Sequence, residues 1–170
     1  MSGLDPKHIG RFFLLIFLQG FFLVNAALFD GLAIPFLYVF IILKLPVDIN
    51  RVLLLVICFI SGLSVDLFYH TLGLHAAACV LMGFIRPGIL NALQPRDGYD
   101  AGASIGISSM GFGWFFIYSV ALIFAHHFYL FFLEIFSFSY IPRTLLKVFL
   151  STAYTFILIL LVHLIFSKRR

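Results

Sequence analysis

Charged residues are scarce in this sequence, and their scarcity argues against a soluble domain. Only 11% of the 170 residues are Asp, Glu, Lys or Arg, whereas soluble domains contain about 25%. The apolar share is 63%, with 23 phenylalanines, and a chain of this length has too little interior to bury so many apolar side chains. The excess must face lipid, so the composition predicts an integral membrane protein.

Sequence patterns of common enzymes and metal sites are also missing. The chain has no nucleotide-binding glycine loop, no H-E-x-x-H and no G-x-S-x-G, and these patterns mark the commonest catalytic sites. An enzyme is therefore disfavoured, and we expect no cofactor and no bound metal. Basic residues are dispersed at the ends of apolar runs, which argues against nucleic acid as a partner. Cys58 and Cys79 lie within apolar runs, where thiols act as small hydrophobes.

Apolar runs separated by turn-forming residues predict an all-α bundle of about six transmembrane helices in a single domain, residues 1–170. The first run lacks a small-residue cleavage site and is expected to stay as a helix. Arg86 and Pro87 are expected to end the fourth helix at the membrane surface. His126 and His127 are expected in the loop before the last helix. The expected ranges are 9–28, 32–45, 52–69, 72–85, 105–124 and 146–166.

Lys and Arg concentrate on one side of this expected topology. Nine of the 11 basic residues fall on one side and two on the other. Cytoplasmic loops are the ones enriched in Lys and Arg, so both termini are expected in the cytoplasm, which requires an even number of spans. The nine are Lys7, Arg11, Lys44, Arg51, Arg86, Arg96, Lys168, Arg169 and Arg170, and the two are Arg143 and Lys147.

One acidic residue, Asp66, lies inside an expected helix and near three other polar side chains. An acid at membrane depth is costly and usually faces the bundle interior or a watery cavity. Asp66 and His70 share a helix face, Tyr69 lies between them, and His75 follows in the next helix. Three interpretations stay open: a structural cap for the turn at Thr71–Gly73, a partner or pore site, and a metal site. Tyr69 and His70, with Pro35 from the short second helix, are the candidate pocket residues.

Small residues cluster where helices are expected to touch. Gly62, Gly73 and Gly83 fall in the third and fourth expected helices or at their join, and Gly102-x-x-x-Gly106 opens the fifth. Small residues let transmembrane backbones approach closely. Packing within the chain and an interface with a partner are both compatible with this pattern.

The stretch from Gly62 to Pro87 resembles the MreD family of rod shape-determining proteins. That family has a G-x-x-x-D segment, a short turn and an L-G-x-x-A element that opens the next helix. In this chain the G-x-x-x-D segment is Gly62 to Asp66, and the L-G-x-x-A element is residues 72–76. Arg86-Pro87 ends the stretch. The size, the expected topology and Pro35 early in the second helix also fit.

The resemblance implies a non-enzymatic scaffold of the cell-elongation complex in the bacterial inner membrane, where it supports peptidoglycan synthesis and cell shape. It implies MreC, a single-span protein with a large periplasmic domain, as the direct partner, and MreB, RodA and its transpeptidase as indirect partners. The lipid bilayer is the other expected partner. The expected partner-binding or structural motif consists of Gly62, Asp66, Gly73, His75, Arg86 and Pro87.

A second function stays open at this stage, the substrate-binding membrane subunit of an energy-coupling vitamin transporter. Such subunits are also small six-helix proteins, so topology does not separate the two. This alternative expects polar side chains that converge on an outer pocket, and the available ones are Asp66, Tyr69, His70, His126 and Glu134.

Overall fold

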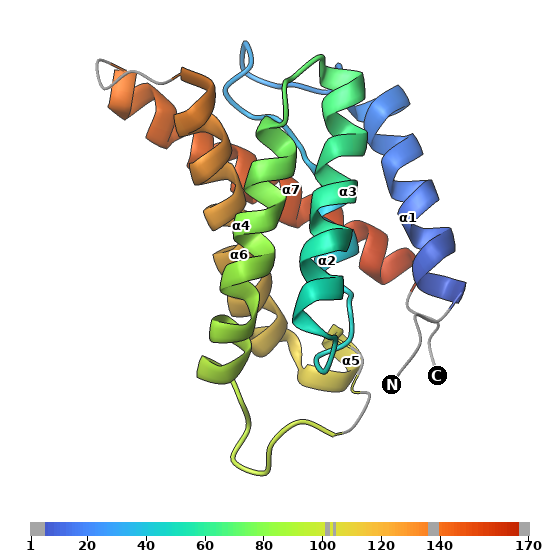
Figure 1. The fold of residues 1–170 in the computed structure, drawn as a ribbon. Coiled ribbons are helices and arrows are strands. Elements are labelled where there is room, and N and C mark those ends of the chain that lie inside the picture. The colour runs from blue at the N-terminus through green and yellow to red at the C-terminus, as the bar shows by residue number, and fades with distance from the viewer. Residues whose placement is uncertain (1–5, 101–102, 104, 136–139, 167–170) are drawn as a thin grey trace.

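The structure, a computed structural model, describes residues 6–100, 103, 105–135 and 140–166, and in these ranges the chain is helical apart from its turns and one central segment (Figure 1). An isolated antiparallel bridge joins Leu28 and Ala33. The elements are α1 (Pro6–Leu18), the π-helical turn η1 (Gln19–Leu23), the 3-10 turn η2 (Leu37–Val39), α2 (Phe40–Leu43), α3 (Arg51–Tyr69), α4 (Leu74–Ala92), α5 (Ile107–Met110), α6 (Phe112–Ile135) and α7 (Ile141–Phe166).

Four of these helices, α3, α4, α6 and α7, are long and apolar enough to cross a membrane. Each leaves large apolar side chains on its outer face, such as Leu67, Phe84 and Phe149, and in water that exposure would be costly. A shorter apolar helix covers His8–Leu23. The four long apolar helices confirm the predictions of an all-α fold and of a membrane protein.

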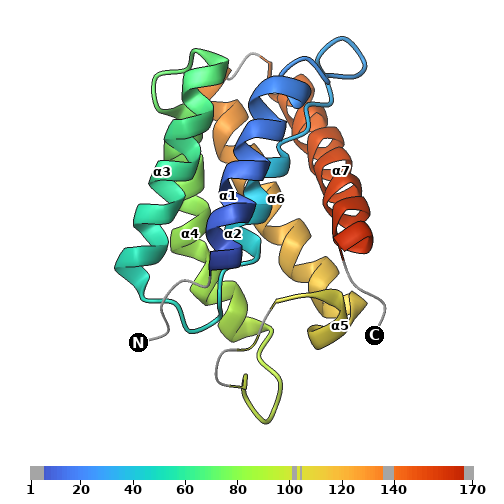
Figure 2. The ribbon, with the colours of Figure 1, turned by 90° about the vertical axis from the view of Figure 1, so that its right-hand side faces the viewer.

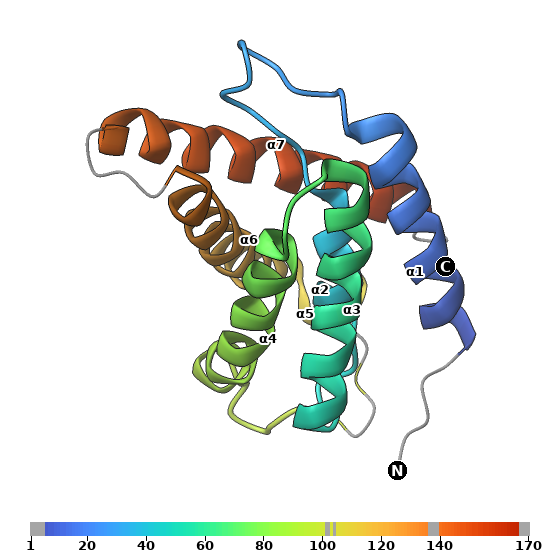
Figure 3. The same cartoon turned by 45° about the horizontal axis from the view of Figure 1, so that its top comes forward.

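The helices surround one short central segment. α3 and α4 form an antiparallel hairpin, α6 packs against α4, and α1 lies beside α3 (Figures 1 and 2). α7 packs on α6 and runs steeply across the direction of α3 and α4 (Figure 3). Figure 2 shows α2 enclosed between α1 and α6.

This central segment, residues 33–45, was expected as a transmembrane helix over 32–45, and that prediction is wrong. The chain is irregular up to Phe36, and only the seven residues from Leu37 to Leu43 are helical. Almost every side chain in it is buried; Tyr38, Val39, Ile42 and Leu43 are 0% exposed. Pro35 lacks the N–H that a helix needs, and non-helical backbone at membrane depth is tolerated only where protein surrounds it.

Other helix boundaries also differ from the sequence prediction: the first helix ends with η1 at Leu23 instead of residue 28, and α7 begins at Ile141 instead of residue 146. α4 continues through Pro87 to Ala92 instead of ending at residue 85. The helix expected at 105–124 begins at Phe112, because Gly111 adopts a φ of +82° that ends the short α5, and it continues to Ile135. Gly106 therefore precedes α5 rather than lying within a long helix, and Gly102 lies outside the described residues.

Candidate functional site in the α3–α4 hairpin

The acidic residue of the motif, Asp66, closes the turn between α3 and α4. One of its oxygens accepts hydrogen bonds from the His75 backbone N–H at 3.0 Å and from the Thr71 hydroxyl, and the other accepts from the Ala76 backbone N–H at 3.0 Å. Gly73 is the N-cap of α4 and has no capping side chain. Asp66 thus supplies from α3 the capping oxygens that α4 lacks.

This cap explains how a carboxylate is tolerated at 3% exposure. Charge-assisted hydrogen bonds to backbone N–H groups are stronger than neutral ones, and the first turn of α4 favours negative charge. Three interpretations of Asp66 were left open by the sequence. The hydrogen bonds in the structure are those of the structural cap. Its neighbour His70 lies exposed in the left-handed conformation, φ 53°, at the end of α3, so it does not join Asp66 in a common site.

Gly62 lets the two helices of the hairpin touch through their backbones. A Cβ atom at this position would lie 2.4 Å from the Ala76 Cα and 2.4 Å from the His75 carbonyl oxygen, well inside contact distance. Further along, a Cβ on Gly83 would lie 2.6 Å from the Cys58 sulfur. The expected tight contact at Gly62 is therefore present within the chain, where it draws α3 against α4.

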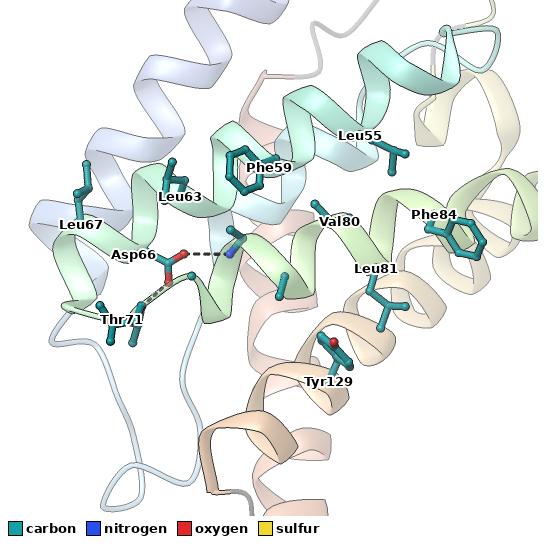
Figure 4. Close-up of a pocket in the computed structure, with 14 residues that line it drawn as sticks. Leu55, Phe59, Leu63, Asp66, Leu67, Thr71, Val80, Leu81, Phe84 and Tyr129 are labelled. Carbon is teal, nitrogen blue, oxygen red and sulfur yellow. Dashed lines mark hydrogen bonds between the residues drawn. The ribbon is translucent and has the colours of Figure 1, made fainter.

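A groove of about 840 Å³ runs along the outside of this hairpin. Its lining is apolar except at one end, where the Asp66 cap and Thr71 close it (Figure 4). Small residues of α4 line part of it, and larger side chains of α3, α4 and α6 line the rest. The small residues are Gly73, Ala76, Ala77 and Val80, and the larger ones include Leu55, Phe59, Leu63, Leu67, Leu81, Phe84 and Tyr129.

His75 belongs to the same motif but contributes to the core rather than the groove. Its Nδ1 lies 3.1 Å from the Tyr38 hydroxyl, which also lies 2.8 Å from Nε2 of His126. The Cys79 thiol lies 3.5 Å from the same hydroxyl. His75 and His126 are at most 3% exposed, and Nδ1 of His126 has no hydrogen-bond partner in the described residues. Tyr38 therefore links the central segment to α4 and α6.

The prediction that His126 and His127 lie in a loop is wrong, because both are fully buried in α6. His127 Nδ1 lies 2.7 Å from the Ile123 carbonyl oxygen, so this nitrogen carries the proton and donates. The other nitrogen must then accept, and the Thr155 hydroxyl lies 3.2 Å from it. Internal hydrogen bonds thus replace the water that a loop position would have offered.

The backbone of the central segment finds its partners in side chains of α7 and η1. The Ile34 N–H donates to the Ser151 hydroxyl at 2.9 Å, and the Phe36 N–H donates to the Thr155 hydroxyl at 3.0 Å. Gln19 donates to the Pro35 carbonyl at 3.1 Å. Buried backbone groups need such partners. We did not predict this role for Gln19, Ser151 and Thr155 from the sequence. For the two hydroxyl residues, the available signal was their spacing of four residues in an apolar helix.

Gln19 also connects two of the three candidate pocket residues. Its amide nitrogen donates to the Tyr69 hydroxyl at 2.8 Å as well as to the Pro35 carbonyl. Tyr69 is half-buried and Pro35 is buried, while His70 is exposed. The structure therefore brings Tyr69 and Pro35 together at η1 and leaves His70 apart from them.

Arg86 was expected to reach the headgroups at the end of its helix, and this prediction is wrong. The side chain is 1% exposed and donates to the Tyr118 hydroxyl at 2.8 Å and to the carbonyls of Leu45 at 2.5 Å and Pro46 at 3.1 Å. Arg86 thus ties α4 to α6 and to the end of the central segment. Pro87 lies inside α4, where it removes one backbone N–H without ending the helix.

Within the described ranges, no group of three or more His, Cys, Asp or Glu side chains could hold a metal ion. In comparisons with known proteins, no family model, no curated protein and no solved structure matches the chain.

Proposed function

We propose that this chain is a non-enzymatic membrane scaffold of the cell-elongation complex, similar to MreD, and that the α3–α4 groove receives a transmembrane helix of its partner. The observation that carries the proposal is the joint placement of Gly62, Asp66 and Gly73. These residues make the hairpin tight and cap it, and the groove lies on the outside of that hairpin.

The shape of the groove suits a helix of another membrane protein. In lipid, helices associate through close packing and a few hydrogen bonds, and small residues allow the backbones to approach. Gly73, Ala77 and Val80 are spaced three to four residues apart, so they follow one face of α4. Phe59 and Phe84 also line the groove (Figure 4), so a partner helix would bury aromatic surface as well as pack against the small residues.

A rigid frame is what such a surface requires, since loose elements would have to be ordered when the partner binds. The Asp66 cap fixes the outer end of the hairpin, and Arg86 fixes its other half against α6 and the central segment. We propose MreC as the helix donor, with MreB, RodA and its transpeptidase reached indirectly.

The proposed topology has six crossings in the bacterial inner membrane, with both termini in the cytoplasm. The long helices α3, α4, α6 and α7 supply four of them. The helix from α1 through η1 supplies the fifth, and the buried central segment, which leads from the Leu28–Ala33 bridge to the start of α3, supplies the sixth. The uneven distribution of Lys and Arg supports this orientation.

The test is affinity purification of the tagged chain from its own cells in mild detergent, followed by mass spectrometry. We expect a single-span protein with a large periplasmic domain, together with cell-wall synthases. Ala77→Phe, which fills the groove, should remove that protein from the eluate. Ala153→Phe is the matched control, because Ala153 is exposed on α7 and does not line the groove.

Two outcomes would contradict the proposal. Recovery of paired ATPases in place of cell-wall synthases would indicate the transporter subunit instead. Equal recovery of the single-span protein by Ala77→Phe and Ala153→Phe would keep the scaffold function but remove the groove as its docking site.

A further inference from the structure

A second pocket lies at the end of the bundle where α3 meets α4, apart from the groove. Its volume is about 430 Å³, within the range of about 300–1,000 Å³ that small-molecule sites have. One wall is the turn that follows η1, and the other is the end of α6 with the start of α7; Figure 2 shows this turn beside the start of α7. The first wall contributes Asp30, Gly31 and Leu32, and the second contributes Ile135, Tyr140, Arg143, Thr144 and Lys147.

The turn that carries Asp30 is held in a conformation that most residues avoid. Leu28 and Ala33 exchange backbone hydrogen bonds of 2.8 and 3.1 Å across its base. Between them Phe29, Asp30 and Gly31 have positive φ angles of 52°, 53° and 82°. A bulky residue such as phenylalanine is rare in this region, and strained backbone of this kind gathers at functional sites. The turn therefore fixes the backbone from which Asp30 reaches the pocket.

The charged side chains of this pocket come from both walls and balance in sign. Asp30 lines one wall, and Arg143 and Lys147 line the other. Lys147 pairs with Glu134 of α6 at 2.9 Å, so this ion pair carries no net charge. In the described ranges of the chain, the side chains of Asp30 and Arg143 have no ion pair and no hydrogen bond. One negative and one positive group thus face the pocket from opposite walls, which is the charge pattern that complements a zwitterion.

The α7 wall is suited to a phosphate. Arg143 and Lys147 are four residues apart, so they share one face of α7. The guanidinium of Arg143 is a planar fork that can bond two phosphate oxygens at once. The Lys147 ammonium is fixed 4.2 Å from the centroid of the Phe131 ring, and Glu134 occupies one of its three N–H donors. Both basic groups therefore have donors left for the oxygens of a ligand.

The pocket lies at the level where lipid headgroups are expected. It is formed where α6 ends and α7 begins, and both helices are long and apolar enough to cross a membrane. Tyr140 at this junction is 58% exposed, and tyrosine is enriched at the membrane interface. A phosphate and an ammonium group with no net charge together are the headgroup of phosphatidylethanolamine. An inorganic phosphate ion would bring no cation for Asp30, and the nitrogen of phosphatidylcholine has no N–H to donate to it.

We propose that this pocket binds the headgroup of phosphatidylethanolamine, with the phosphate on Arg143 and Lys147 and the ammonium group on Asp30. The bound headgroup would join the turn after η1 to the start of α7, which are distant in sequence. No residue that lines the α3–α4 groove lines this pocket, so the inference does not depend on the proposed partner of the groove.

The experiment titrates phosphatidylethanolamine or phosphatidylcholine into the purified chain in neutral detergent and follows the thermal unfolding midpoint. The two lipids share the phosphate, but the nitrogen carries N–H donors in the first and methyl groups in the second. We expect phosphatidylethanolamine to raise the midpoint more, since a ligand that binds only the folded state stabilises it. Asp30→Asn should abolish this difference between the lipids. Arg143→Gln should weaken the apparent binding of phosphatidylethanolamine about fivefold, the effect of about one basic residue near a lipid phosphate.

Asp48→Asn and Arg51→Gln are the matched controls, because both residues are exposed at the start of α3, outside the pocket. Both should keep the wild-type response to the two lipids. Equal midpoints in the two lipids, a preference for phosphatidylethanolamine that persists in Asp30→Asn, or equal losses in the control variants would overturn the proposal. A full shift from free phosphoethanolamine at the same concentration would overturn its lipid form and leave a site for a soluble zwitterion.

Discussion

The backbone nitrogen of Ala76 lies 3.0 Å from a carboxylate oxygen of Asp66, and this bond ties the end of α3 to the start of α4. The companion bond from the His75 N–H has the same length. Because the side chain that caps α4 comes from the preceding helix, a single carboxylate joins the two helices at their turn.

Asp66→Asn tests the cap directly. An asparagine amide retains one acceptor oxygen but turns an N–H donor toward the other backbone N–H, which is then left unsatisfied. We expect a loss of about 1–3 kcal/mol in the free energy of unfolding, measured by thermal or denaturant unfolding in detergent. Asp30→Asn is the control, since Asp30 is exposed; equal losses in the two variants would contradict the capping role.

Gly62→Ala tests the close approach of α3 and α4. The added methyl group would meet the Ala76 backbone at 2.4 Å, and overpacking of this kind costs about 1–3 kcal/mol. Gly10→Ala provides the comparison, because a Cβ at Gly10 meets nothing within 4 Å and alanine is the better helix former. Unfolding midpoints should fall for the first variant and stay level or rise for the second. An unchanged midpoint for Gly62→Ala would show that the helices can separate without cost.

Thr155→Val tests the polar support of the central segment. The hydroxyl accepts from the Phe36 N–H and bonds His127, so its removal leaves a buried donor and a buried acceptor without partners. The expected loss is about 1–3 kcal/mol or more. Thr152→Val is the matched control one turn earlier in α7: the Thr152 hydroxyl is buried and has no hydrogen-bond partner among the described residues, so this substitution should be neutral or stabilising. The reverse order of stabilities would refute the assigned role.

Tyr99→Phe tests the loop that follows α4. The Tyr99 hydroxyl donates to the Leu90 carbonyl at 2.7 Å, and burial raises the pKa of this hydroxyl above 10.0. The unfolded chain therefore loses the phenolic proton at a lower pH than the folded chain, so this contribution to stability is present below about pH 10 and declines as pH rises above it. The wild type should lose more stability than Tyr99→Phe between about pH 9 and pH 11. Parallel curves would exclude the hydrogen bond as a source of stability.

The parts of the fold that sequence predicted well are those with local signals. The expected helix at 52–69 matches α3, Arg51–Tyr69, because a single apolar run fills it and Asn50 caps its start with a 2.9 Å bond from the Val52 N–H. The turn before α4 was also identifiable from Gly73, whose φ of +86° suits glycine.

The central segment could not be predicted in the same way, since its composition is that of a transmembrane helix. What makes it irregular is Pro35 together with acceptors and donors at Gln19, Ser151 and Thr155, and these are distant in sequence. His126 and Arg86 were assigned to the surface because they are polar. Both are buried, because Tyr38 and Tyr118 provide partners that only the folded bundle brings near.

The most direct test of the scaffold proposal is photocrosslinking in living cells from a benzoylphenylalanine placed at Leu81, a large side chain that lines the groove. The same probe at Phe149, exposed on α7, reports the background from lipid and from passing proteins. The account predicts that mass spectrometry of the Leu81 adduct identifies a single-span membrane protein with a large periplasmic domain, absent from the Phe149 adduct. Adducts with phospholipid alone at Leu81, or with the same proteins at both positions, would contradict it.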